Sequence, residues 1–166
     1  MVIRPLFLVG LILVFTGCSS TPPYVYRFVP GITATVHNGF AVAPSQAPES
    51  VRAAIAAGNR IAGSPYRMGG GHSRSFDSAY DCSGATSFVL QAAGKLSGPM
   101  PSSGFRQYGK SGHGDWISVY ARKGHVFLVV AGLRFDTGWA PGPRGPKWTS
   151  KTRPAKKYVV RHPPGL

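Results

Sequence analysis

The chain has 166 residues, of which 43% are hydrophobic, and these values suit a single domain with one modest core. Its 19 Lys and Arg residues outnumber 5 Asp and Glu residues, so the formal net charge is +14 and acidic partners are favoured. The sequence has no zinc-finger spacing and no aromatic-basic signature of an RNA-binding sheet, so nucleic acid is not an expected partner. A solvated basic surface without a specific ligand is the alternative explanation of the charge.

The N-terminal segment 1–17 has the features of a secretory signal. One basic residue, Arg4, precedes an apolar run from Leu6 to Phe15, which is too short to span a bilayer because about 20 residues are needed. Small residues then precede Cys18 and resemble a bacterial lipobox, which implies cleavage before this cysteine and its lipidation. Ser19 follows instead of Asp, which implies the outer membrane in a Gram-negative cell. The alternative is an ordinary signal peptide with an incidental cysteine.

Residues 18–48 are rich in Pro, Ser and Thr, which predicts a tether of about 30 residues with a short strand near 32–36. The folded domain is therefore expected at 49–166. Its first helix is predicted to follow Pro48 and to end at the Gly-Ser-Pro sequence 63–65. Apolar residues fall on one face of this helix at helical spacing: Val51, Ala54, Ile55, Ile61 and Ala62.

A second helix is predicted within YDCSGATSFVLQAAG, with Asp81 as its N-cap and Gly94 at its end. Its expected apolar stripe consists of Ala85, Phe88, Val89 and Ala92. Segments rich in β-branched and aromatic residues then predict strands at 116–120, 125–131, 133–136 and 157–161. Two helices followed by several antiparallel strands indicate an α+β fold.

Cys82 lies in the first turn of this second helix and has three possible roles: a buried small hydrophobe, half of a disulfide, or a nucleophile. The chain has two cysteines, so a lipid on Cys18 leaves Cys82 without an intramolecular disulfide partner. A thiol at a helix N-terminus meets unpaired N–H groups and the positive end of the helix dipole, which favours the nucleophilic thiolate. A neighbouring imidazole would complete its activation.

His125 opens the most apolar predicted strand, where it must find a partner or line a cleft. If Ala131 and Gly132 form a two-residue hairpin turn, Asp136 falls on the same sheet face as His125, one diagonal step away. A carboxylate there can orient the imidazole and stabilise its charged form. A bulge would break this register, and each residue alone also fits a structural role. The remaining histidines, which we expect to be incidental or on the surface, are His37, His72, His113 and His162.

Two blocks of the sequence resemble the NlpC-type cell-wall cysteine peptidases. The first is SPYRMGGGHSRSFDSAYDCSGATSFVLQAAG, with its Pro-Tyr-x-x-Gly-Gly loop and Asp-Cys-Ser-Gly motif, and the second is GDWISVYARKGHVFLVV. The resemblance spans residues 53 to 136. It implies a papain-like α+β fold, with N-terminal helices packed on a central antiparallel sheet. It also implies cleavage of peptidoglycan stem peptides, typically between D-glutamate and the diamino acid.

Residue by residue, the resemblance implies that Cys82 is the nucleophile and His125 the general base. Tyr66 matches the motif tyrosine beside the nucleophile, whose hydroxyl helps to bind the substrate or the oxyanion. Asp81 and Ser83 match positions that contact the free amine end of the stem peptide. The backbone N–H of Cys82 is the other expected oxyanion donor.

The sequence departs from the family pattern at three positions. Asp136 falls near the third, histidine-orienting position, which is more often a histidine or an amide residue. Arg67 and Met68 replace the apolar and aromatic residues usual after the tyrosine, which puts specificity at that wall of the cleft in question. Such a triad needs no cofactor, and neither a carboxylate pair nor a His cluster shows metal-ligand spacing.

The sequence thus predicts a monomeric, lipid-anchored cysteine endopeptidase whose partners are peptidoglycan stem peptides and, through Cys18, the membrane. One alternative is an N-acetylmuramoyl-L-alanine amidase, or acyl transfer on the same scaffold. The other is a non-catalytic peptidoglycan-binding lipoprotein with a degenerate cleft.

Overall fold

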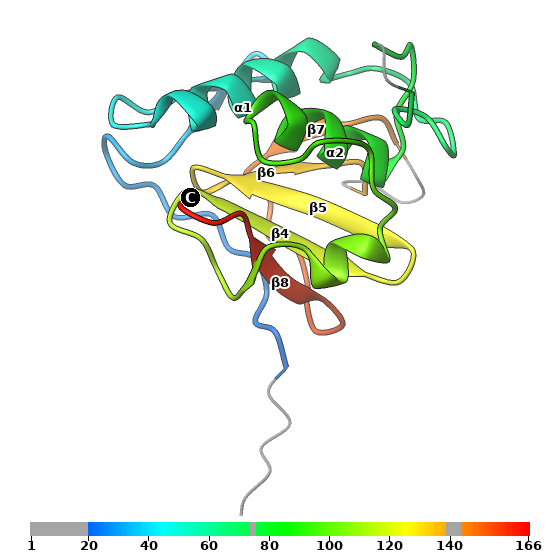
Figure 1. Ribbon diagram of the computed structural model, residues 1–166. Helices are drawn as coiled ribbons and strands as arrows, with labels where there is room; N and C mark the ends of the chain where they lie inside the picture. The colour runs from blue at the N-terminus through cyan, green and yellow to red at the C-terminus, as the bar shows by residue number, and fades with distance from the viewer. Residues whose placement is uncertain (1–19, 74–75, 139–143) are drawn as a thin grey trace, which may run out of the picture.

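The computed structural model describes residues 20–73, 76–138 and 144–166 (Figure 1). The predicted α+β class is confirmed, because two α-helices accompany a six-stranded antiparallel sheet. Within the described residues, no helix is long and apolar enough to cross a membrane. The elements are β1 (Thr35–His37), β2 (Phe40–Val42), α1 (Glu49–Ile61), α2 (Cys82–Ala92), the 3-10 helix η1 (Gly104–Gln107), β3 (Lys110–Ser111), β4 (Ile117–Arg122), β5 (His125–Val130), β6 (Leu133–Asp136), β7 (Lys147–Thr149) and β8 (Val159–His162).

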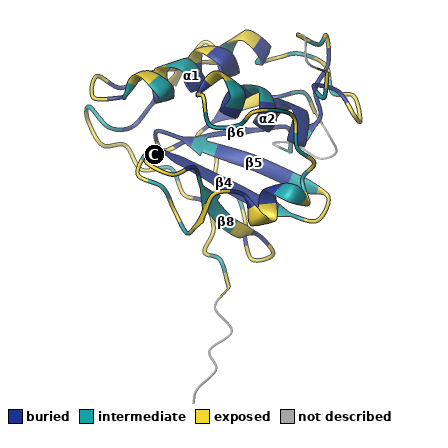
Figure 2. Cartoon of the chain, in the orientation of Figure 1, coloured by how far each residue is buried: buried dark blue, intermediate teal, exposed yellow. Residues whose placement is uncertain are grey.

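The large sheet has the strand order β3-β8-β4-β5-β6-β7, and α1 and α2 cover one of its faces (Figure 1). Alternate residues of β5 point to opposite faces. Val126 and Leu128 join the main core with Val51 of α1 and Val89 of α2. Phe127 lies on the other face, in a second aromatic cluster. Both faces of the central strands are therefore covered, and β4 and β5 are buried along most of their length (Figure 2).

The hairpin of β5 and β6 has the predicted register. Val130 pairs with Leu133, and the two-residue turn between them consists of Ala131 and Gly132. Both turn residues have positive φ values of 45° and 74°, as the type I′ turn requires. Continuing this register places Asp136 diagonally across from His125.

The start of α2 is also as predicted. Asp81 has extended backbone angles, and its carboxylate accepts a hydrogen bond of 2.7 Å from the Gly84 N–H. The first turn of the helix packs tightly on the glycine loop before it. A Cβ atom at Gly84 would lie 2.0 Å from the Gly70 carbonyl oxygen. This close approach holds the N-terminus of α2, and Cys82 with it, against the loop.

The predicted tether at 18–48 is wrong from residue 20 onward, because these residues pack on the domain. Tyr24 is 4% exposed, exchanges backbone hydrogen bonds with Arg153, and donates its hydroxyl proton to the Gly132 carbonyl. The strands β1 and β2 form a hairpin, and Ala34 and Ala41 enter the main core. The Pro- and Ser-rich composition hid these apolar anchors. The predicted signal peptide 1–17 and Cys18 lie outside the described residues.

The other predicted elements appear with small shifts at their ends. In α2, Ala92 is exposed and Leu90 is buried in its place, so the apolar stripe was partly wrong. The strands β2, β3 and β7 and the helix η1 were not predicted, because each is short and lies among Gly, Pro and Ser residues. Of these, β7 matters most for the site, since it extends the sheet beside β6.

We expect Gly84→Ala to lower the free energy of unfolding by about 1–3 kcal/mol, because the new methyl group would collide with the Gly70 carbonyl. Alanine usually stabilises a helix relative to glycine, so a lower free energy of unfolding would point to the collision and not to helix propensity. Denaturant unfolding measures it. Gly98→Ala is the matched control, since a Cβ there meets no atom within 4 Å. Equal stability of the two variants would contradict the packing argument.

Candidate active site

Cys82 is a free, half-buried thiol at the first position of α2. Its backbone N–H is among the first four of the helix, which have no intrahelical acceptor. Asp81 caps the helix through the Gly84 amide and directs its carboxylate into the loop. The thiol therefore lies at the positive end of the helix dipole, next to donors that can stabilise an oxyanion.

His125 begins β5 and contacts both Cys82 and Asp136. Its Nε2 atom lies 2.9 Å from Oδ1 of Asp136, which leaves Nδ1 as the ring nitrogen available to the thiol. Burial lowers the pKa of His125, but hydrogen bonds to Asp136 and Cys82, together with their negative charges, raise it to about 9. The imidazole is therefore protonated at neutral pH.

Asp136 lies at the centre of a buried ionic network. Its Oδ2 atom accepts a hydrogen bond of 2.8 Å from Arg134 and lies 2.9 Å from Nη1 of Arg153. The Gly138 amide donates to Oδ1 at 2.7 Å. Burial raises the pKa of Asp136, but the hydrogen bond and charge of His125, the charge of Arg153 and the Gly138 amide outweigh burial and lower it below the usual value. Asp136 is therefore an ionised carboxylate.

Asp81 and Ser83 flank Cys82 in the sequence and are both buried. Asp81 accepts hydrogen bonds from Ser83 Oγ at 2.9 Å and from the Gly69 amide at 2.9 Å, in addition to the cap of α2. His72 completes the cluster, because its Nε2 atom lies 3.2 Å from Asp81 Oδ1 and 3.1 Å from Ser83 Oγ. His72 is half-buried, and was expected on the surface; instead it occupies the polar side of the Asp-Cys-Ser segment.

Tyr66 lies within the electrostatic influence of Cys82 and Asp81. Burial and the negative charges of Cys82 and Asp81 raise the pKa of Tyr66, so its hydroxyl stays protonated and can donate a hydrogen bond. Its neighbours Arg67 and Met68 are exposed. Arg67 forms an ion pair of 2.8 Å with Asp77. The unusual pair of residues after the tyrosine thus points away from the core.

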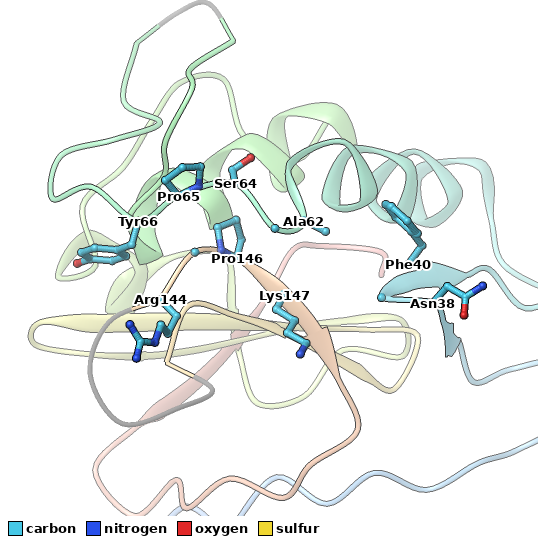
Figure 3. A pocket seen from close by; sticks show the side chains of 12 residues that line it. Asn38, Phe40, Ala62, Ser64, Pro65, Tyr66, Arg144, Pro146 and Lys147 are labelled. Carbon is cyan, nitrogen blue, oxygen red and sulfur yellow. The ribbon is translucent and has the colours of Figure 1, made fainter.

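A groove of about 710 Å³ begins at Tyr66, and we call it the Tyr66 groove. Figure 3 shows Tyr66 at one end, Phe40 and Asn38 toward the other, and the basic side chains of Arg144 and Lys147 along one side. Its remaining lining comes from the β1–β2 turn, the segment after α1 and the residues just before β7: Gly39, Ala62, Gly63, Ser64, Pro65, Gly145 and Pro146. The β1–β2 hairpin, which was expected to be tether, therefore forms one end of this groove.

The structure brings Cys82, His125 and Asp136 together, whereas Cys18 lies outside the described residues. Sequence reasoning missed Arg134 and Arg153. Alternation in β6 could have revealed Arg134, because residues two apart share a strand face. Arg153 follows β7 in a loop without a local pattern that marks it. In the described part of the chain, no group of three or more His, Cys, Asp or Glu residues is arranged to hold a metal ion.

Comparisons with protein-family models, with curated proteins and with solved structures give no match for this chain. The chemistry of the site therefore has to be argued from its geometry. A thiol, an imidazole and a carboxylate in this order can perform nucleophilic catalysis by acyl transfer.

We expect Asp136→Asn to lower the pKa of His125 from about 9, because the variant keeps burial, which lowers this pKa, and loses the hydrogen bond to the carboxylate and its charge, which raise it. The substitution removes the negative charge and leaves two guanidinium groups near the ring. An NMR titration of the His125 ring carbons measures the shift. The variant should also unfold more easily, by about 3–5 kcal/mol, because buried charges lose their partner.

The control is Asp115→Asn, which removes an exposed carboxylate outside this network. It should leave the His125 titration unchanged. If His125 of the Asp136→Asn protein still titrated near 9, Asp136 would not be the group that supports the imidazolium.

Proposed function

We propose that this protein is a lipid-anchored cysteine endopeptidase of the bacterial envelope that cleaves peptidoglycan stem peptides, at the bond between D-glutamate and the diamino acid. The observation that carries the proposal is the Cys82 thiol at the start of α2 beside His125, whose Nε2 is held by Asp136. The resemblance to NlpC-type peptidases supports the substrate and a papain-like fold. The lipobox-like sequence before Cys18 supports the anchor and a location facing the periplasm.

In the proposed first step, the Cys82 thiolate attacks the carbonyl carbon of the scissile amide. The carbonyl π electrons move to oxygen, and the N–H of Cys82 and the Tyr66 hydroxyl donate hydrogen bonds to this oxyanion. When the oxyanion collapses, the C–N bond breaks and the His125 imidazolium protonates the leaving amine. The products are a free amine, a thioester on Cys82 and a neutral imidazole.

In the second step, the neutral His125 accepts a proton from a water molecule, which attacks the thioester carbon. Collapse of the second oxyanion breaks the C–S bond, restores the thiolate–imidazolium pair and releases the product as a carboxylic acid, which loses its proton to solvent. Asp136 keeps Nε2 of His125 occupied throughout, so Nδ1 stays directed at the thiol. Because Asp136 is buried, water does not compete for its hydrogen bond with His125, and the ring keeps its orientation.

The Tyr66 groove supports a substrate rich in carboxylates. Arg144 and Lys147 give one side of the groove positive charge, and Phe40 and Pro65 give it apolar surface. Stem peptides combine carboxylates with small apolar side chains. The overall charge of +14 would raise the local concentration of such a substrate.

We expect Cys82→Ala to abolish release of muropeptides from purified sacculi, with a loss of at least about 1,000-fold, because no other group can form the thioester. Mass spectrometry of the soluble products measures both the rate and the bond cut. His113→Gln, which changes an exposed histidine, is the control and should retain activity. Release by the Cys82→Ala protein at the wild-type rate would reject the proposal.

The same spectra separate the alternatives. Stem peptides with a free amino group on their N-terminal L-alanine, together with peptide-free glycan, would identify an amidase that cuts next to muramic acid. Sacculi that bind the wild-type protein but release nothing would identify a non-catalytic wall-binding lipoprotein. Either result would replace the endopeptidase assignment.

We expect Arg144→Glu to raise KM for a soluble disaccharide-peptide about three- to tenfold and to leave kcat nearly unchanged, because a rim charge contributes attraction but no chemistry. Steady-state kinetics at low and high salt measure the effect, which should shrink as salt screens the charge. Arg106→Glu, at an exposed position of η1, makes the same charge change outside the groove. If both variants raised KM equally, the effect would come from the net charge of the protein and not from Arg144 in the groove.

A further inference from the structure

A second hollow of about 550 Å³ is lined in part by Arg153, the partner of Asp136, and we call it the basic pocket. Its lining is Arg122, Arg153, Pro154, Lys156, Lys157 and Tyr158. Lys156 and Lys157 are exposed, and the Arg122 guanidinium lies 5.4 Å from the centre of the Tyr158 ring. Arg153 is part of the lining, and its guanidinium is directed to Asp136. Two lysines and an arginine therefore surround an opening to solvent.

One acid offsets part of the charge of this surface, because the buried Asp136 pairs with Arg153. The exposed Lys156 and Lys157 have no acid close to them in the sequence, since residues 137–166 include seven Lys and Arg residues and neither Asp nor Glu. Of the remaining acids, Asp77 pairs with Arg67 and Asp81 is buried. Glu49 starts α1 on the helix side of the sheet, and Asp115 precedes β4, whose opposite end is Arg122. The basic pocket thus presents a concentrated positive field.

The N-terminal segment reaches the domain at this same surface. Thr21 donates its hydroxyl proton to the Tyr158 carbonyl, and Tyr24 exchanges backbone hydrogen bonds with Arg153. Figure 1 shows the described chain beginning beside the loop between β7 and β8. Cys18 precedes Thr21 by three residues, and three residues span at most about 11 Å. A lipid on Cys18 would therefore hold the basic pocket close to the bilayer.

We propose that the basic pocket and the Lys156–Lys157 turn form a docking face for the phosphate headgroups of an anionic phospholipid bilayer. The face is on the side of the sheet that is opposite α1 and α2, where Tyr158 and Tyr24 pack with Phe127. The exposed Val25, next to Tyr24, adds apolar surface at this side. Basic residues at an anionic surface each add attraction, and apolar contact strengthens it.

This docking gives the domain a defined orientation. Cys82 packs against the main core on the helix side, so contact through the opposite sheet face directs the nucleophile away from the membrane. This orientation rests on the proposed lipid anchor and peptidase function, whereas binding of the face to anionic lipid does not.

The test is co-sedimentation of the protein with lipid vesicles. The chain used starts at Ser19, so it contains the whole described fold and lacks the lipid. It should bind vesicles of phosphatidylcholine mixed with phosphatidylglycerol and dissociate from them as the salt concentration rises. It should not bind vesicles of pure phosphatidylcholine. The variant Lys156→Glu with Lys157→Glu should lose affinity for the anionic vesicles on the order of thirtyfold or more.

The matched control is Arg52→Glu with Arg60→Glu, which makes the same charge change at exposed positions of α1. It should keep most of the vesicle affinity, and thermal unfolding should show that both double variants fold. Equal losses in the two variants would overturn the docking face, because net charge would explain binding. Absence of binding by the wild-type chain would also overturn it.

Further measurements distinguish membrane docking from binding to the cell wall and from the peptidase assignment. Acetylation of Lys156 and Lys157, read by mass spectrometry, should slow on anionic vesicles while that of Lys95 does not. If the Lys156→Glu, Lys157→Glu variant lost binding to sacculi and kept binding to vesicles, the face would serve the wall and the proposal would be wrong. Cys82→Ala should bind vesicles normally, so failure of the peptidase assignment and failure of the docking face give different results.

Discussion

The burial of one carboxylate, that of Asp136, is the constraint on which the candidate site depends. Its side chain has no exposed surface, and removing an ion from water costs several kcal/mol unless other groups replace the solvent. His125, Arg134, Arg153 and the Gly138 amide are those groups. Because they come from β5, from β6 and its following turn, and from the loop after β7, one charge ties several chain segments to one point. Such a cluster specifies geometry more than it adds stability.

The same cluster determines the charge around the thiol. Two guanidinium groups and a protonated imidazole surround a single carboxylate, so the region has excess positive charge. That excess would favour an anion in a transition state formed there. The Tyr66 hydroxyl stays neutral beside them. The Asp136 carboxylate is thus matched by the two arginines that accompany it.

Local rules accounted for the parts of the fold that depend on local chemistry. Asp81 caps α2 through its own carboxylate, and the Ala131–Gly132 turn sets the hairpin register, so both were predictable from short stretches of sequence. From these two rules followed the start of α2 at Cys82 and the approach of Asp136 to His125.

Prediction failed where tertiary packing decides. The N-terminal segment looked like a tether because Pro and Ser outnumber its apolar residues, yet burial of Tyr24 and Ala34 fixes it to the domain. The role of Arg153 could not be predicted, because its partners Asp136 and Tyr24 lie in other segments of the chain. His72 was expected on the surface, since a glycine-rich loop carries no periodic pattern that shows which way its side chains point.

The backbone pairing of Tyr24 with Arg153 links the N-terminal segment to the centre of the site, since the Arg153 side chain holds Asp136. In the proposed peptidase, anchorage and activity would therefore be joined mechanically. A protease cut between Cys18 and Thr21 would release the described domain from the proposed lipid anchor, whereas a cut after Tyr24 would separate the backbone partner of Arg153 from the domain. Only the first cut would leave Arg153 in position, so proteolytic release of the proposed enzyme would be restricted to a short stretch of the chain.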